Sequence, residues 1–163
     1  MKCAKHLGLL QAVIVGLFAL MPVSAQAQRA RINKLSDVAF GSITNFAIDQ
    51  TRSQSICVFT TPLGTRYRVT ATGSGTGGAF TLATGGSTMA YEVQWAATAG
   101  QTVGTALTSG VPLTNLTTAA TRSGCTVAPA TSASLITILR SATVSAARSG
   151  SYTGTLTLLI APN

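Results

Sequence analysis

The sequence predicts an all-β protein, an antiparallel β-sandwich built from one domain. Several segments alternate apolar and polar residues with a period of two, and turns rich in glycine, serine and threonine separate them. After residue 27 no segment sustains the 3.6-residue period of a helix. Short strands of this kind, together with a single pair of cysteines, are typical of a sandwich. No repeat of solenoid or propeller length is present.

The N-terminus has the three parts of a secretory signal peptide. Lys2 and Lys5 precede an apolar run at 7–20, and Ala25-Gln26-Ala27 offers a small-x-small cleavage site. Cleavage after Ala27 would leave residues 28–163 as the mature domain, and cleavage after Ala25 is the second choice. A transmembrane anchor is the alternative, but the run is shorter than the roughly 20 residues that span a bilayer. We expect an exported chain with no membrane-spanning segment after cleavage.

The chain is basic. Loss of Lys2 and Lys5 with the signal peptide lowers the formal net charge from +8 to +6. An excess of this kind can attract nucleic acid or a membrane surface. The remaining basic residues form no run, however, and export argues against a nucleic-acid partner. We interpret them as solvated, with surface attraction a minor alternative: Arg29, Arg31, Lys34, Arg52, Arg66, Arg68, Arg122, Arg140 and Arg148.

Two cysteines remain in the mature chain, Cys57 and Cys125. An even number of cysteines in an exported protein predicts one disulfide. The alternative is a pair of metal-bound thiolates, which lacks companions because the single histidine, His6, leaves with the signal peptide.

The first half of the mature domain contains three strand patterns. Residues 28–34 are a short basic lead-in, and residues 35–43 carry a modest strand pattern with Val38 and Phe40 on one side. Residues 55–60 are apolar on both faces, as in a central strand. Residues 66–72 alternate, and Tyr67, Val69 and Ala71 are expected to point inward.

The second half continues the same pattern. Residues 79–82 predict a short strand, and residues 89–95 alternate with an inward stripe that we interpret as core. Residues 96–123 are low in complexity and predict loops and short edge strands. Residues 134–139 predict a buried strand, while residues 141–148 are ambiguous.

A long final strand is predicted at 150–160. Its apolar face holds Tyr152, Gly154, Leu156, Leu158 and Ile160, and threonines occupy the other face. Pro162 follows and cannot donate to a ladder. A long apolar strand in this place either completes a closed sheet or leaves an edge that needs a partner.

Side-chain chemistry argues against an enzyme. The mature chain has no histidine and only three carboxylates, Asp37, Asp49 and Glu92, which lie far apart in the sequence. A Ser–His–Asp triad is therefore impossible, and a Ser–Lys dyad with Lys34 is the pairing left open. The glycine-rich loop at 73–78 lacks the lysine and the helix of a phosphate-binding loop. We expect no catalytic residues, no metal and no cofactor.

Several segments together resemble the spore coat protein U domain, which occurs in subunits of archaic, Csu-type chaperone–usher pili. The resemblance covers the chain from about Val38 to Ile160, and its most specific piece is the Gly-x-Tyr-x-Gly-Thr-Leu-Thr-Leu pattern. The segments that carry it are Cys57-Val58, Tyr67 to Thr70, Phe80 to Leu82, Met89 to Trp95, Cys125 and residues 150–158.

The resemblance implies an immunoglobulin-like sandwich that lacks its last strand. A periplasmic chaperone supplies that strand first, and the N-terminal arm of a neighbouring subunit replaces it after passage through an outer-membrane usher. The site implied is a strand-acceptor groove lined by Tyr152, Leu156, Leu158 and Ile160. The implied destination is the cell surface, as part of a fimbrium.

One departure concerns the N-terminal arm. Family members have a longer alternating arm and an upstream cysteine, whereas here only Ala30 and Ile32 alternate before Lys34. We therefore expect a subunit that accepts a strand without donating one, as at the tip of a fibre. The alternative is a self-contained secreted sandwich that binds a glycan or another surface ligand.

Overall fold

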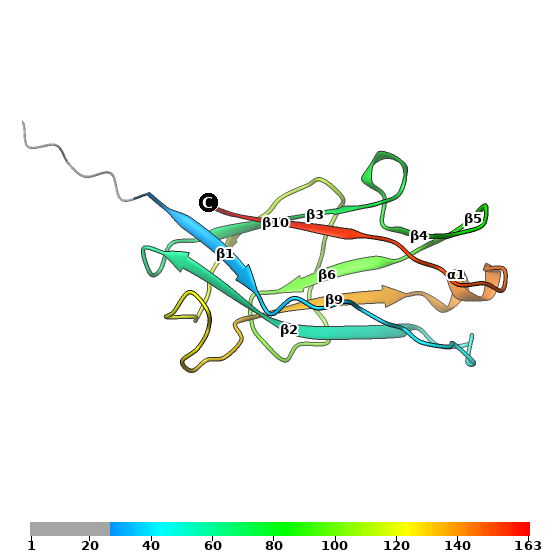
Figure 1. Ribbon diagram of the computed structural model, residues 1–163, viewed down its shortest axis with the longest axis horizontal. Coiled ribbons are helices and arrows are strands. Elements are labelled where there is room, and N and C mark those ends of the chain that lie inside the picture. The colour runs from blue at the N-terminus through cyan, green and yellow to red at the C-terminus, as the bar shows by residue number, and fades with distance from the viewer. Residues whose placement is uncertain (1–26) are drawn as a thin grey trace, which may run out of the picture.

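A computed structural model describes residues 27–163, and of the predicted signal peptide only Ala27 lies within the described residues. The strands form two layers and a hairpin (Figure 1). One sheet has the order β1-β2-β9-β6-β7, the other has the order β10-β3-β8, and β4 pairs with β5. Every pairing is antiparallel, so the predicted all-β, immunoglobulin-like sandwich class is confirmed.

The elements are β1 (Arg29–Asn33), β2 (Gln50–Thr61), β3 (Tyr67–Gly73), a 3-10 turn (Thr76–Gly78), β4 (Thr81–Thr84), β5 (Ser87–Ala90), β6 (Glu92–Ala96), β7 (Thr105–Ala106), β8 (Leu113–Leu116), β9 (Ala133–Leu139), α1 (Ser141–Ala146) and β10 (Leu156–Pro162).

The core lies between the two sheets. Tyr67, Val69 and Ala71 of β3 are fully buried, as the alternation in that strand predicts. All residues of β9 are buried, as expected for the buried strand predicted at 134–139. The indole Nε1–H of Trp95 donates a hydrogen bond of 3.2 Å to the hydroxyl of Tyr67. Burial raises the pKa of Tyr67 to about 12, so this hydroxyl stays neutral.

The N-terminal lead-in is a strand rather than a loose arm. β1 pairs with β2 from Arg29 opposite Thr61 to Asn33 opposite Cys57. Ala30 and Ile32 therefore face inward and pack against the core.

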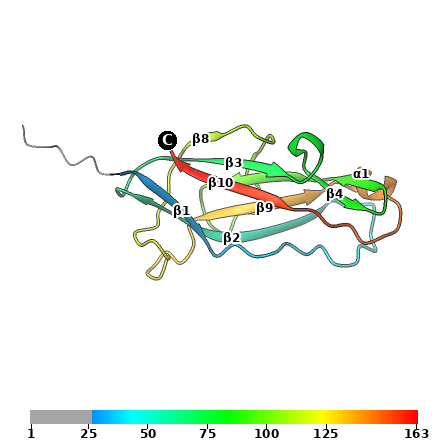
Figure 2. The same ribbon diagram turned by 45° about the horizontal axis from the view of Figure 1, so that its top comes forward.

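The strand expected at 35–43 is not formed. The backbone turns at Lys34, which has a φ of 63°, and this left-handed conformation ends β1. The Nζ of Lys34 is held at 2.7 Å from the carbonyl oxygen of Ala130. The segment that follows runs beside β2 (Figure 2) without joining it in a ladder.

The final strand is shorter than predicted and begins at Leu156. Residues before it cross the β4–β5 hairpin, where the Thr153 and Ala83 backbones exchange two hydrogen bonds. Gly154 permits this crossing, because a Cβ there would lie 2.8 Å from the carbonyl oxygen of Thr81. Pro162, expected to lie beyond the strand, is its last residue.

Two other segments differ from their patterns. The alternation at 89–95 divides at Tyr91, whose N–H donates to the carbonyl of Phe80, so β5 joins the hairpin and β6 joins the larger sheet. The ambiguous segment 141–148 contains the short helix α1.

Candidate functional site

An elongated groove of about 1570 Å³ runs along the side of the sandwich where β10 lies. One wall is formed by residues 150–158, including the start of β10. The opposite wall is formed by residues 35–46, here called the wall segment. We refer to the space between them as the β10 groove.

The β10 wall presents apolar side chains to the groove. Leu156 and Leu158 are half-buried and line the groove. Leu159, the next residue along β10, points away from the groove and is 62% exposed. One edge of β10 pairs with β3 from Leu156 to Pro162. Within residues 27–163 the other edge has no ladder partner, because β10 ends its sheet.

The wall segment has no ladder of its own. No backbone–backbone hydrogen bond joins it to a strand among the described residues. Side chains of β2 hold it instead: Arg52 donates to the carbonyls of Ala39 and Phe40, at 3.2 and 3.1 Å, and Gln54 bonds Ser36. The Arg52 guanidinium also lies 5.6 Å from the centre of the Phe40 ring.

Apolar side chains of the wall segment remain accessible. Leu35 and Phe46 are 46% and 51% exposed, and Phe40 and Ile43 are half-buried against the core. Exposed apolar side chains that line one groove are typical of an interaction site.

The floor of the groove is the hydrophobic core itself. Its residues come from β5, from the link between β5 and β6, from β9 and from α1, and each is less than a tenth exposed: Met89, Tyr91, Leu135, Leu139 and Val144. Burial raises the pKa of the Tyr91 hydroxyl. An extended segment placed in the groove would therefore cover core side chains and meet a free strand edge at the same time.

The structure brings three of the four predicted groove residues together. Tyr152, Leu156 and Leu158 line the groove. Ile160 is not among the lining residues, and it packs against the core instead. Their role as acceptors of a strand stays a prediction.

Sequence reasoning missed the opposite wall. The sequence pattern places Phe40 on one side of an expected strand at 35–43 and gives Ile43 and Phe46 no role in a site. The available signal was the apolar series at 35, 38, 40, 43 and 46, whose spacing follows neither a strand nor a helix. Such a series is typical of an irregular segment that lies along a core without joining a sheet.

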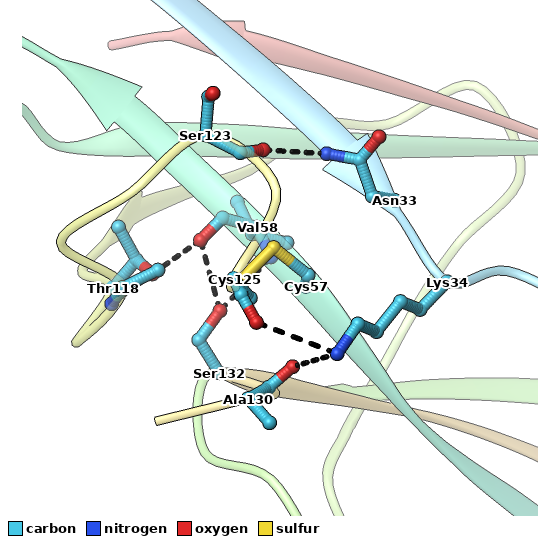
Figure 3. The surroundings of a disulfide bond; sticks show 10 residues. Asn33, Lys34, Cys57, Val58, Thr118, Ser123, Cys125, Ala130 and Ser132 are labelled. Atoms are coloured by element: carbon cyan, nitrogen blue, oxygen red, sulfur yellow. Dashed lines mark hydrogen bonds between the residues drawn. A yellow bond between two sulfur atoms is a disulfide. The ribbon is translucent and has the colours of Figure 1, made fainter. Parts of the chain in front are cut away.

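The predicted disulfide is formed. Cys57 and Cys125 are bonded and buried at 0% and 2% exposure (Figure 3). The bond fixes the loop at 118–132 to the outer face of β2, and the hydroxyl of Thr118 donates to the carbonyl of Val58 there. The hydroxyl of Ser132 donates to the same carbonyl at 2.9 Å.

Two of the three carboxylates meet at one arginine, which the sequence did not predict. The guanidinium of Arg140 lies 2.7 Å from Asp49 and 2.5 Å from Glu92. A hydrogen bond from the Ser141 backbone, followed by that from Arg140, lowers the pKa of Asp49. The hydrogen bond from Arg140 lowers the pKa of Glu92. This cluster ties the start of α1 to the start of β2.

Residues 27–163 contain neither a cluster of metal ligands nor a membrane-spanning helix. No group of three or more His, Cys, Asp or Glu side chains is placed to hold a metal ion. No helix in this part of the chain is long and apolar enough to cross a membrane.

Comparisons with known proteins give one finding. No family model matches the chain, and no curated protein does. Among solved structures, the chain is similar to a protein in a chaperone–tip adhesin complex of CFA/I fimbriae biogenesis, with a TM-score of 0.50 and 13% identity. The match covers 82% of this chain and 41% of that one, so this chain spans about two-fifths of its length. The likeness shows the fold.

Proposed function

We propose that this protein is a structural or adhesive subunit of a surface fibre, and that a strand from another chain completes its sandwich. The β10 groove carries the proposal. The free edge of β10 borders a groove whose floor is core and whose opposite wall forms no ladder. An added strand would gain backbone hydrogen bonds from β10 and would bury alternate side chains on the floor.

Apolar side chains buried on the floor would add to the backbone hydrogen bonds of the joint. Each Leu- or Val-sized side chain moved from water into the groove contributes about 1.5–3 kcal/mol. The groove runs past Leu158, Leu156 and Tyr152, so an occupant with three alternating apolar side chains could use its whole length.

The finer assignment rests on the resemblance to the spore coat protein U domain. It predicts a periplasmic chaperone as the first occupant, an outer-membrane usher, and neighbouring pilus subunits as final partners. Export with the predicted signal peptide and display on the cell surface belong to the same proposal. The fold shared with a protein of a fimbrial chaperone–tip adhesin complex supports it. No step of this role needs catalysis.

The pairing of β1 supports a place at the tip of the fibre. A donor arm must be free to enter a neighbour, whereas residues 29–33 pair with β2 and bury Ala30 and Ile32 in this domain. The proposed subunit accepts a strand and gives none.

The decisive test compares two substitutions on β10. Leu158→Asp places a charge at the groove face, and Leu159→Asp places the same charge on the exposed face of the same strand. Each variant is exported to the periplasm with a co-expressed pilus chaperone, and the captured fraction is measured by pull-down. Burial of an unpaired carboxylate costs several kcal/mol. Capture should therefore fall at least tenfold for Leu158→Asp and stay near the wild-type level for Leu159→Asp.

Expression without the chaperone tests the same proposal independently. An incomplete sandwich should aggregate or be degraded. A soluble, cooperatively melting monomer made without any chaperone, or equal capture of both variants, would refute strand completion at this groove. That result would favour a self-contained surface-binding sandwich.

A further inference from the structure

Three arginines surround a second hollow, away from the β10 groove. Arg29 and Arg31 come from β1, and Arg122 comes from the loop at 118–132. The hollow measures about 560 Å³ and is also lined by Phe59, Thr61, Thr121 and Ser123, and by Ala27, the last residue of the predicted signal peptide. We call it the arginine hollow.

Strand register places two of these arginines on one face. Arg29 lies opposite Thr61 and Arg31 lies opposite Phe59 in the β1–β2 ladder. Directly opposed Cβ atoms in such a ladder are about 4.5–5.5 Å apart. Because Ala30 and Ile32 point into the core, Arg29 and Arg31 extend from the outer face of the sheet.

The third arginine is brought over that face by covalent and hydrogen bonds. Cys57 lies on the same side of β2 as Phe59, and its disulfide to Cys125 holds the loop there. The Asn33 side chain donates a hydrogen bond of 2.7 Å to the carbonyl of Ser123, next to Arg122 (Figure 3). The position of Arg122 is therefore set by the fold rather than by a free loop.

The hollow has an uncompensated charge. None of its lining residues is acidic, and among the described residues the only ion pairs are those of Arg140 at the other end of β2. The guanidinium groups of Arg29, Arg31 and Arg122 make no hydrogen bond to any described residue and are exposed. Three like charges around one hollow repel each other, and a bound anion would relieve the repulsion.

We propose that the arginine hollow binds a carboxylate- or sulfate-bearing sugar unit of an acidic polysaccharide. Guanidinium forks match the two oxygens of such groups in a bidentate manner. The hydroxyls of Thr61, Thr121 and Ser123 suit the hydroxyls of a sugar, and the half-buried Phe59 offers an apolar surface to its ring. The volume is that of a small-molecule site, larger than one inorganic anion needs.

This site is independent of strand completion. The hollow lies on the outer face of the β1–β2 sheet, whereas the β10 groove opens onto the core. A subunit with a filled groove would keep the hollow exposed, so polysaccharide binding would add an adhesive surface to the proposed fibre subunit.

The test uses two charge-matched double variants of the mature export product, each purified in complex with the co-expressed chaperone so that the β10 groove is occupied. Arg29→Gln/Arg31→Gln empties the hollow of two charges, and Arg66→Gln/Arg68→Gln removes the same charge from the opposite sheet. Binding of a sulfated heparin oligosaccharide, an oligogalacturonate and a neutral malto-oligosaccharide is measured by calorimetry. Vesicles containing phosphatidylglycerol form a fourth arm. Near-UV circular dichroism checks that each variant is folded.

The proposal expects binding to one or both acidic oligosaccharides and none to the neutral one. Each lost guanidinium should raise Kd about threefold to tenfold, so the first double variant should bind about ninefold to 100-fold more weakly. Arg122→Gln should show the single-residue effect. Equal weakening by Arg66→Gln/Arg68→Gln would mean non-specific attraction and would overturn the proposal. Binding to vesicles alone, or to no probe, would overturn it as well.

Discussion

Removal of the disulfide should cost a large part of the stability of the domain. The change is Cys57→Ala together with Cys125→Ala. The bond joins residues 68 positions apart, and release of a loop of this length returns about 4 kcal/mol of conformational entropy to the unfolded chain at 25 °C. For a domain of this size, each kcal/mol lowers Tm by about 3–4 °C, so a decrease of about 12–16 °C is expected.

The assay is thermal and urea unfolding followed by circular dichroism, with both proteins in the same state of groove occupancy. Asn33→Ala serves as the control, since it removes only the exposed hydrogen bond to the carbonyl of Ser123 in the same loop. Its expected cost is about 1 kcal/mol or less. A double variant that melts within about 3 °C of the wild type would refute the loop-entropy reasoning.

Two further predictions concern the core and the acidic cluster. Tyr67→Phe removes the acceptor of the buried Trp95 N–H, so the free energy of unfolding in urea should fall by about 1–3 kcal/mol. An unchanged urea midpoint would mean that another group accepts this hydrogen bond in the variant. The pKa values of Asp49 and Glu92 are lowered from their ordinary values of 3.8 and 4.5, so both carboxylates stay ionised and in contact with Arg140 above those pH values. The contacts are lost as the pH falls through the pKa values of the folded protein. NMR shifts of α1 amides should therefore be constant down to about pH 5 and change below about pH 4, and no change down to about pH 2 would refute the assignment.

Strands with clear alternation were predictable because every second side chain of a strand faces the core. The inward stripe of Tyr67, Val69 and Ala71 is fully buried, and the disulfide joins Cys57 and Cys125 as expected. In these cases the two-residue period of a strand and the even number of cysteines each indicated a single arrangement.

The two segments at the start of the mature chain were predicted less well, because the local pattern did not decide their structure. Arg29 to Asn33 looks like a polar lead-in, yet it forms a strand because β2 extends far enough to pair with it. Apolar residues from Leu35 onward look like a strand, but the left-handed turn at Lys34 directs them along the core. One wall of the β10 groove is formed by the second of these segments, so that wall depended on a turn at Lys34 that the local pattern does not define.

The way in which the wall segment is attached sets how tolerant the groove is of its occupant. A wall that belonged to a ladder could move only by breaking a row of backbone bonds. This wall is fastened through the side chains of Arg52 and Gln54, which are long and have many rotamers. The groove can therefore widen or narrow by small side-chain adjustments. Occupants with bulkier or smaller side chains at successive positions would fit the same domain, and selectivity among them would be set at β10 and the rigid floor.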